Sequence, residues 1–312
     1  MLINEKTFTD FDLYANSMLK WDVEFNQLVG GQFRGYIKQI ILPNVIVQKY
    51  YLNKSCSVRG NAPTGFYNFS LGIKSNDKTI WRGKQFRDNE IAVYPNGAEF
   101  DGVTPDDFNS FEIAISKKLL RKVSNYLGID ELDNYLKFNE ICRCDPLKIN
   151  RFKYLLNTLM NYKFVDPLVC PKRVFIKQAE YEVAESLLKT IHISEPKTGY
   201  LQTDNRMNAI GKVEELIADI NDDRLTVLDL CEAANVSQRT LEYAFKNKFN
   251  MTPKQYLNKI RLNKVKRILQ NPDDQNTKII DAANLYGFWH MGQFAKDYKK
   301  LFGELPSDTL KS

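Results

Sequence analysis

The 312-residue sequence is short of histidine, of paired cysteines and of long apolar runs. Its two histidines are His192 and His290, and neither lies in the region that is rich in predicted strands. We therefore expect no histidine-based metal site in that region and no metal cofactor. No apolar stretch approaches the ~20 residues that cross a bilayer. The first residues lack the charged-then-apolar pattern of a secretory signal. These absences predict a cytoplasmic protein that does not bind a membrane.

The cysteines are odd in number and lack the Cys-x-x-Cys spacing of redox and zinc sites. We expect free thiols in a reducing compartment. The five are Cys56, Cys142, Cys144, Cys170 and Cys231.

Two domains are expected, because a single core stops growing near ~250–300 residues. Between residues 30 and 116 apolar residues alternate, and turn signals recur every ~8–12 residues, which predicts a small β-barrel or sandwich. The predicted strands cover residues 36–41, 45–51, 66–73, 79–81, 90–94 and 110–115. Apolar residues spaced by three and four predict helices at 117–127, 145–162 and 174–193, and residues 8–19 predict a shorter one.

One apolar pattern occurs twice near the C-terminus. Leu241, Phe245, Phe249 and Pro253 are followed, 53 residues later, by Phe294, Tyr298, Phe302 and Pro306. A large apolar residue at every fourth position is typical of the buried stripe of a helix. Before each stripe a short helix is predicted, with Cys231 or Ala283 as its small residue, and then a tight turn at Asn235 or Gly287, residues that readily adopt positive φ. A short helix, a turn and a second helix form a helix-turn-helix unit, so the repeat predicts a protein that contacts DNA twice.

The sequence around the second unit resembles a known family. Residues 287–294, Gly-Phe-Trp-His-Met-Gly-Gln-Phe, and 298–307, Tyr-Lys-Lys-Leu-Phe-Gly-Glu-Leu-Pro-Ser, are similar to the signature of the AraC/XylS transcription regulators. Three positions depart from it: Asn235, Cys231 and Gly292. The resemblance implies a C-terminal DNA-binding domain and an N-terminal cupin-like β-barrel that binds a small effector.

These observations predict an α+β chain. Residues 1–195 would form the cupin-like barrel with appended helices, 196–203 a linker, and 204–312 an all-α DNA-binding domain. Within it we place the first unit at 226–249, a long linker helix at 253–270 and the second unit at 277–302. Thr226, Thr252 and Thr277 are predicted to cap helices.

The residues that periodicity leaves on the outer sides of the two second helices are the candidates for DNA contact. Arg, Gln and Glu side chains can read guanine, adenine and cytosine in the major groove. Candidates for base contact are Gln238, Arg239, Glu242, Tyr243, His290, Met291, Gln293 and Lys296. Candidates for phosphate contact are Lys246, Lys259, Arg261 and Lys299. Trp289 is expected to fill the core at the turn.

Positive charge is concentrated in the same region. The chain carries a net charge of +6, and residues 237–271 contain nine Lys or Arg against one acid, Glu242. A solvated helix face would give the same composition. Because the run overlies the first predicted DNA-contacting helix, we interpret it as a phosphate-binding surface.

The predicted barrel offers aromatic residues with arginines among them, which would suit a carboxylate ligand such as an aromatic or fatty acid. Alternatively these residues only fill the barrel. Weak candidates for effector binding are Arg34, Arg59, Tyr51 and Trp81.

We expect a transcription regulator and not an enzyme, with duplex DNA, RNA polymerase and a second copy of the chain as partners. The second copy would bind through the helices of the N-terminal domain. Two alternatives remain open. One is an effector-independent DNA binder. The other is a DNA-alkyl transferase, for which Cys142 and Cys144 are the candidate nucleophiles.

Overall fold

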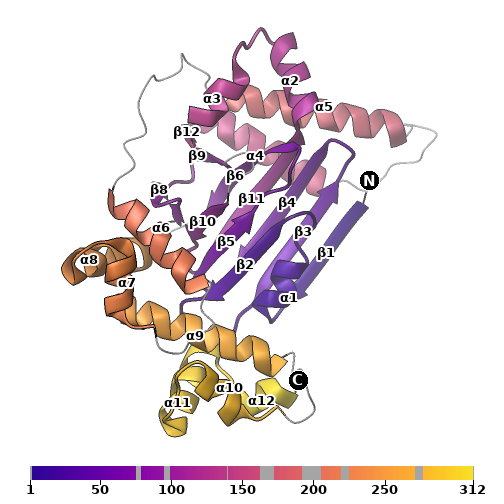
Figure 1. Ribbon diagram of the computed structural model, residues 1–312. Coiled ribbons are helices and arrows are strands. Elements are labelled where there is room, and N and C mark those ends of the chain that lie inside the picture. The colour runs from indigo at the N-terminus through magenta and orange to yellow at the C-terminus, as the bar shows by residue number, and fades with distance from the viewer. Residues whose placement is uncertain are drawn as a thin grey trace. The chain divides into compact units, whose positions relative to one another are not determined.

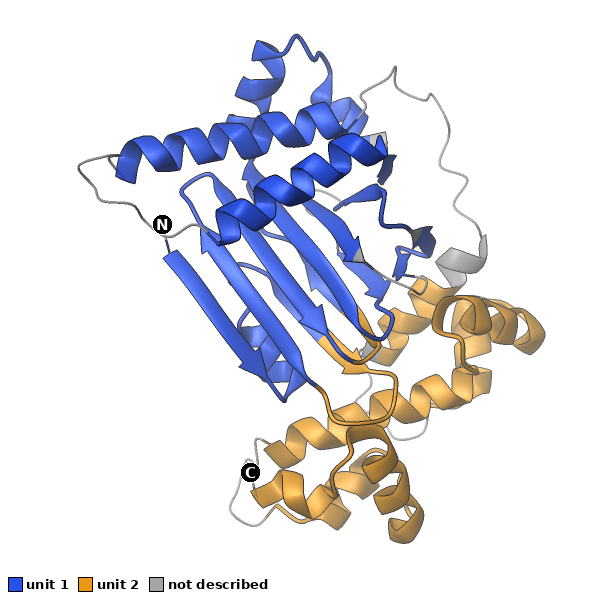
Figure 2. Cartoon of the chain, turned by 180° about the vertical axis from the view of Figure 1, so that it is seen from behind, with its two compact units in different colours: residues 1–24, 34–53, 59–200 blue, residues 25–33, 54–58, 201–312 orange. Residues whose placement is uncertain are grey.

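The computed structural model describes residues 2–74, 79–94, 99–138, 140–161, 172–191, 205–218, 225–270 and 277–311. The chain forms two compact units (Figure 2). Unit 1 contains Met1–Glu24, Arg34–Asn53 and Arg59–Tyr200. Unit 2 contains Leu201–Ser312 together with Phe25–Phe33 and Lys54–Val58, two segments that we had assigned to the N-terminal domain. The predicted linker at 196–203 lies outside the described residues.

The strands form two sheets (Figure 1). The seven-stranded sheet has the order β1 (Leu2–Phe8), β3 (Gly35–Ile41), β4 (Val45–Leu52), β11 (Phe108–Ser116), β6 (Phe66–Lys74), β9 (Glu90–Val93) and β12 (Ile141–Arg143). The five-stranded sheet has the order β2 (Asp22–Gln27), β5 (Cys56–Asn61), β10 (Phe100–Val103), β7 (Thr79–Trp81) and β8 (Lys84–Phe86). Neighbouring strands of the larger sheet are antiparallel.

One face of the larger sheet is apolar because side chains alternate along each strand. Ile40, Val47, Ile113 and Phe69 stand opposite one another in register across β3, β4, β11 and β6, and all are buried. They belong to one core with the helices α2 (Lys117–Tyr126), α4 (Pro146–Met160) and α5 (Lys172–Thr190). Figure 2 shows α4 and α5 lying across this sheet.

The helix boundaries follow from local capping. Asp145 accepts hydrogen bonds from the backbone nitrogens of Leu147 and Lys148 at the start of α4, and Ser116 accepts from Leu119 at the start of α2. A further helix, α3 (Leu132–Phe138), was not predicted. The helix predicted at 8–19 is shorter: Leu2–Phe8 is strand β1, and α1 spans only Phe11–Asn16.

Unit 2 is helical. Its helices are α6 (Asn205–Ala218), α7 (Val227–Ala234), α8 (Gln238–Phe249), α9 (Pro253–Gln270), α10 (Ile279–Leu285), α11 (Met291–Phe302) and α12 (Pro306–Lys311). The pair α7 and α8 and the group α10–α12 lie at opposite ends of α9 (Figure 1). At 1.5 Å per residue the 18 residues of α9 span roughly 27 Å.

The sequence repeat corresponds to two buried stripes. Leu241, Phe245 and Phe249 on α8 are at most 4% exposed, and so are their counterparts Phe294, Tyr298 and Phe302 on α11. The repeated prolines, Pro253 and Pro306, begin α9 and α12 and are buried. The prediction of an α+β chain with an N-terminal β domain and a C-terminal helical domain is confirmed. Among the described residues, no helix is both long and apolar enough to cross a membrane.

Candidate DNA-binding surface

The first helix-turn-helix unit is fixed by local hydrogen bonds. Thr226 and Asp229 form a capping box at the start of α7, as the prediction for Thr226 requires. The helix ends at Asn235, which has φ 53° and ψ 48°, the left-handed conformation that Asn tolerates. Ser237 then caps α8 by accepting a hydrogen bond from the backbone nitrogen of Thr240. The turn predicted at Asn235 is confirmed.

The second unit reaches the same shape with fewer caps. Gly287 supplies the left-handed turn, with φ 80°. The prediction that Thr277 caps the following helix is wrong: Lys278 is the N-cap of α10 and makes no side-chain capping bond. His290 is the N-cap of α11, also without such a bond. Packing of Phe288 on Phe294, with ring centroids 5.2 Å apart, therefore takes a larger part in holding this turn.

The outer side of α8 is polar and exposed. Gln238, Arg239, Glu242 and Tyr243 all lie on the exposed side, and Tyr243 is 55% exposed although it is aromatic. The Gln238 amide nitrogen donates to the Glu242 carboxylate at 2.8 Å. This bond aligns two side chains that are able to read base edges.

The outer side of α11 repeats this arrangement. His290, Gln293 and Lys296 are exposed, and Met291 is half-buried. Gln293 donates to Asp297 at 2.9 Å, which matches the Gln238–Glu242 pair on α8 and adds an acid that the prediction did not include. The expectation that Trp289 fills the core is wrong, because its side chain is 66% exposed.

Part of the basic run has a structural role. Lys248 is buried and pairs with Glu214 at 2.7 Å, and Lys266 is buried and pairs with Glu304 at 3.2 Å. Interpreting the whole run as a phosphate-binding surface is therefore wrong for these two lysines. The second helix of each helix-turn-helix unit carries exposed cations: Arg239 and Lys246 on α8, and Lys296, Lys299 and Lys300 on α11.

Two of the four phosphate candidates are exposed and two are engaged. Lys246 and Lys299 are exposed. Lys259 is half-buried and donates to the Leu28 carbonyl, and burial lowers the pKa of its ammonium group. Arg261 donates to the Leu225 carbonyl at 2.9 Å.

Lys259 meets a segment that comes from far away in the sequence. We call Phe25–Phe33 the strap; it belongs to unit 2 and lies on α9 and on the end of α11. Asn263, fully buried, accepts from the Gln27 backbone nitrogen at 3.0 Å and donates to the Gln27 carbonyl at 3.1 Å. One turn further along α9, Arg267 donates to the Phe25 carbonyl at 2.7 Å and to the Asn26 side chain at 3.0 Å.

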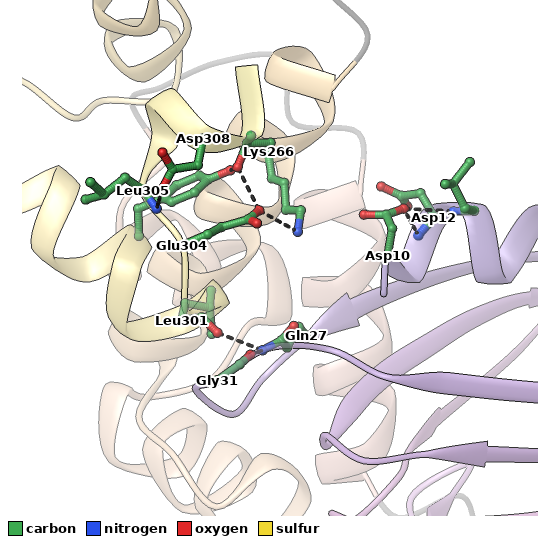
Figure 3. Close-up of polar contacts among 12 residues, drawn as sticks. Asp10, Asp12, Gln27, Gly31, Lys266, Leu301, Glu304, Leu305 and Asp308 are labelled. Carbon is green, nitrogen blue, oxygen red and sulfur yellow. Dashed lines mark hydrogen bonds and ion pairs between the residues drawn. The ribbon is translucent and has the colours of Figure 1, made fainter. Parts of the chain in front are cut away.

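The other half of the strap is bound to α11 (Figure 3). The Gln27 side-chain nitrogen Nε2 donates to the carbonyls of Val29, Gly31 and Leu301, each at 2.7 Å. Gly31 donates to Leu301 at 3.0 Å. Gly30 has to be glycine, because a Cβ there would lie 2.4 Å from the Lys300 carbonyl oxygen. Sequence reasoning missed the strap: the partners are 236 residues apart, and only the glycine pair at 30–31 marks a close approach of backbone.

Comparison with known proteins decides the family. A family profile described as a helix-turn-helix domain matches residues 230–312. The XylDLEGF operon transcriptional activator 2 of Pseudomonas putida is 32% identical over 128 residues, which are 41% of this chain and 80% of that protein. The chain belongs to the AraC/XylS family of DNA-binding transcription regulators.

Other AraC/XylS proteins match over a smaller part of their length or at lower identity. The XylDLEGF operon transcriptional activator of Pseudomonas putida is 40% identical over 82 residues, which are 26% of this chain and 26% of that protein. Among solved structures, the AraC-like transcriptional activator CuxR is 12% identical, with a TM-score of 0.45 over 83% of this chain and 94% of that one. ToxT from Vibrio cholerae is 13% identical, with a TM-score of 0.31 over 99% and 97%.

The thiols do not support the alkyl-transferase alternative to an AraC/XylS regulator. Cys142 and Cys144 are 3% and 7% exposed. Burial raises the pKa of Cys142 to about 11 and that of Cys144 to about 12. A nucleophilic cysteine needs an accessible thiolate, so neither residue is equipped for this chemistry. Cys170 lies outside the described residues.

The effector candidates do not gather into one site. Arg34 is exposed, and Tyr51 donates a hydrogen bond to Asp107 at the surface. Arg59 forms a two-bond pair with Glu99, with both bonds at 2.6 Å. Only Trp81 is buried, at 5% exposed. Arg34 lies at the surface and Arg59 is paired with an acid, so effector binding by these residues stays a prediction.

Proposed function

We propose that this regulator binds one DNA duplex with α8 and α11 in successive major grooves. The observation that carries the proposal is the repeated division of the two helices into a buried apolar side and an exposed polar side. Successive major-groove segments on one face of a duplex lie ~34 Å apart. A single helix of 18 residues between the units suits that spacing.

We propose that specificity comes from the exposed residues of the two helices. On α8 these are Gln238, Arg239, Glu242 and Tyr243, and on α11 His290, Met291, Gln293 and Lys296. A bidentate contact from Arg239 to guanine is the strongest single contact available to the first helix. Within each Gln–acid pair the Gln carbonyl is left to accept from adenine while its nitrogen is held by the acid.

Lys246 and Lys299 are the supported phosphate contacts, because both are exposed near the ends of the two DNA-contacting helices. For Lys259 and Arg261 the assignment requires that a phosphate binds beside their present carbonyl partners or replaces them. Each phosphate contact contributes about one unit to the salt dependence of binding. Salt dependence can therefore separate the two groups.

The further partners that we propose are a small organic effector in unit 1, RNA polymerase and a second copy of the chain. Support for a partner surface comes from large apolar side chains exposed on the helices of unit 1: Tyr126 on α2, Leu147 and Tyr154 on α4, and Val174 on α5, each at least 54% exposed. Support for polymerase contact comes from the relatives, which are named as transcriptional activators.

The experiment is a selection of duplexes from a random pool with the full chain, followed by fluorescence anisotropy on the selected site. Arg239→Ala should weaken binding by ~1–3 kcal/mol and relax the preference at one base pair. Arg151→Ala, an exposed arginine on α4, is the matched control and should bind as the wild type does. If Arg239→Ala binds the selected and the scrambled duplexes with the same affinities as the Arg151→Ala control does, α8 does not read DNA.

Salt titrations complete the test. Lys246→Ala should lower the slope of log K against log salt by about one unit for every duplex. If Lys259 stays bound to the strap in the complex, Lys259→Ala leaves the slope unchanged. An equal loss in both variants would show that Lys259 also contacts a phosphate.

A further inference from the structure

The turn of the second helix-turn-helix unit is one residue longer than that of the first. In the first unit a single residue, Val236, separates the left-handed Asn235 from Ser237, the N-cap of α8. In the second unit two residues separate the left-handed Gly287 from His290, the N-cap of α11. The additional residue therefore belongs to the second turn alone.

Trp289 is that additional residue. In the first unit the backbone nitrogen of Val236 donates to the Cys231 carbonyl at 3.0 Å. In the second unit the backbone nitrogen of Phe288 donates to the Ala283 carbonyl, also at 3.0 Å. Val236 and Phe288 therefore correspond, and Trp289 has no counterpart in the first unit. Its side chain is 66% exposed and stands directly before the N-cap of α11.

The first turn of α11 lacks the polar side chains that begin α8. The first two residues of α8 are Gln238 and Arg239, whereas those of α11 are Met291 and Gly292. Together with Trp289, this end of α11 offers an indole ring and a thioether in place of an amide and a guanidinium group. It is therefore suited to apolar contact and not to the hydrogen bonds through which polar side chains read bases.

The packing of unit 2 does not require the glycine at Gly292. Glycine is the poorest helix former after proline. Nothing lies within 4 Å of a Cβ placed on this residue, and its backbone is not left-handed, so neither space nor conformation excludes a side chain. A glycine that the fold itself does not need is typical of a place where another molecule closely approaches the backbone.

The chemistry of the major groove indicates what this end of α11 contacts. In a helix-turn-helix protein the N-terminal residues of the second helix contact base edges. The apolar group that the major groove displays is the methyl group of thymine, which apolar side chains contact. The indole of Trp289 has one N–H donor at its edge, so its two faces are free for such a contact.

We propose that Trp289 and Met291 contact the methyl group of a thymine in the major groove, and that Gly292 leaves the space in which DNA approaches α11. The inference rests on the proposed function, in which α11 enters a major groove, and adds what α11 reads there. The two units then read DNA by different chemistry: α8 forms hydrogen bonds, and α11 makes an apolar contact.

Deoxyuridine in the DNA tests this contact without any change in the protein. Each thymine of the selected duplex is replaced singly by deoxyuridine, which lacks only the 5-methyl group, and binding of the full chain is measured by anisotropy. One replacement should weaken binding by the wild type about fourfold, the contribution of one buried methyl group. The same replacement should leave the affinity of Trp289→Ala unchanged, because that variant has already lost the contact.

Two variants and a control test the protein side. Trp289→Ala should bind the unmodified duplex at least about fourfold more weakly, with an unchanged salt slope because the ring carries no charge. Gly292→Ala should bind about tenfold more weakly although its melting temperature does not fall, which separates this loss from unfolding. Leu285→Ala removes another exposed apolar side chain, on α10, and as the control should bind as the wild type does.

Tryptophan emission reports whether the ring meets DNA. The chain has three tryptophans, and Trp21 and Trp81 are only 8% and 5% exposed. In the free protein a neutral quencher such as acrylamide should therefore reach chiefly Trp289, and the selected duplex should protect it. In Trp289→Phe quenching should be weak both with and without the duplex.

Three results would overturn the inference: a deoxyuridine scan that affects the wild type and Trp289→Ala alike, wild-type affinity in Trp289→Ala, or an equal loss in Leu285→Ala. Wild-type affinity in Trp289→Ala would mean that the exposed ring meets something other than DNA. If Arg239→Ala loses its base preference while Trp289→Ala binds normally, only this inference fails. If the chain selects no duplex at all, the proposed function fails as well.

Discussion

Asn263, Arg267 and Lys259 hold the strap on α9, and Asn263→Leu should loosen it. Leucine has the same branching at Cγ as asparagine, with two larger methyl groups, but it neither accepts nor donates, so the backbone nitrogen and carbonyl of Gln27 both lose their partner inside the protein. A buried polar group without a partner costs about 1–3 kcal/mol. Two such groups cost about 2–6 kcal/mol, a large part of the ~5–15 kcal/mol that stabilises a domain.

Hydrogen exchange measured by mass spectrometry reports the loss of protection in the strap itself. The Gln27 amide is protected by its bond to Asn263, so the exchange of strap peptides should accelerate about 30-fold or more for a loss of about 2 kcal/mol. Asn258→Leu, a half-buried asparagine five residues earlier on α9, is the control and should leave exchange in the strap unchanged. Gln27→Leu should add less to Asn263→Leu than it costs alone, because either change frees the strap. Wild-type exchange in Asn263→Leu would refute the reasoning.

Three further predictions concern single sites. Burial raises the pKa of Glu112 to about 7, against 4.5 for the free group. The free energy of unfolding is therefore highest below about pH 4.5, where the carboxyl group is protonated in both states. It falls by about 3 kcal/mol as the pH rises to about 7. Urea titrations of Glu112→Gln should lack this loss, and an unchanged pH profile would contradict the assignment. Gly292→Ala should stabilise unit 2 by up to ~1 kcal/mol in thermal unfolding, because nothing lies within 4 Å of a Cβ there; a lower melting temperature would contradict it. Cys142 and Cys144 should react with a thiol reagent only after denaturant is added, since both are buried with raised pKa values; labelling of either one in the native chain would show that it is accessible.

The repeat near the C-terminus was predictable because helix periodicity is local. Leu241 and Phe294 need only their own helices to be recognised as buried, and both are at most 1% exposed. Asn235 was predictable for a similar reason: few residues adopt positive φ, and its φ is 53°. In each case the residue type reports a constraint within a few positions along the chain.

Strands were predicted less completely than helices. The expected runs at 36–41 and 45–51 correspond to β3 and β4, but β1, β2, β5, β8, β10 and β12 were missed. Residues Leu2–Phe8 read as Leu-Ile-Asn-Glu-Lys-Thr-Phe, with much of their surface exposed, because β1 is an edge strand. An edge strand is stabilised by backbone bonds to its neighbour, here β3, and not by a buried stripe that the sequence would display.

Charge and aromatic character were the poorest guides to the candidate site. Lys248 and Lys266 look the same in sequence as Lys246, yet both are buried against acids from elsewhere in unit 2, Glu214 on α6 and Glu304 between α11 and α12. Trp289 was assigned to the core by residue type, yet the turn at Gly287 leaves it 66% exposed. Whether a cation meets solvent or an acid depends on contacts between elements, which periodicity does not encode.

The strap is the part of the sequence that local reasoning could not place. It follows Glu24 and precedes Arg34, and both of these flanking residues belong to unit 1. Asn263 and Arg267 nevertheless hold the strap on α9, more than 230 residues later in the chain. Because α9 also joins the two helix-turn-helix units, the strap is bonded to the helix that lies between them. Bonds across such a sequence separation leave no periodic pattern, so only the structure reveals them.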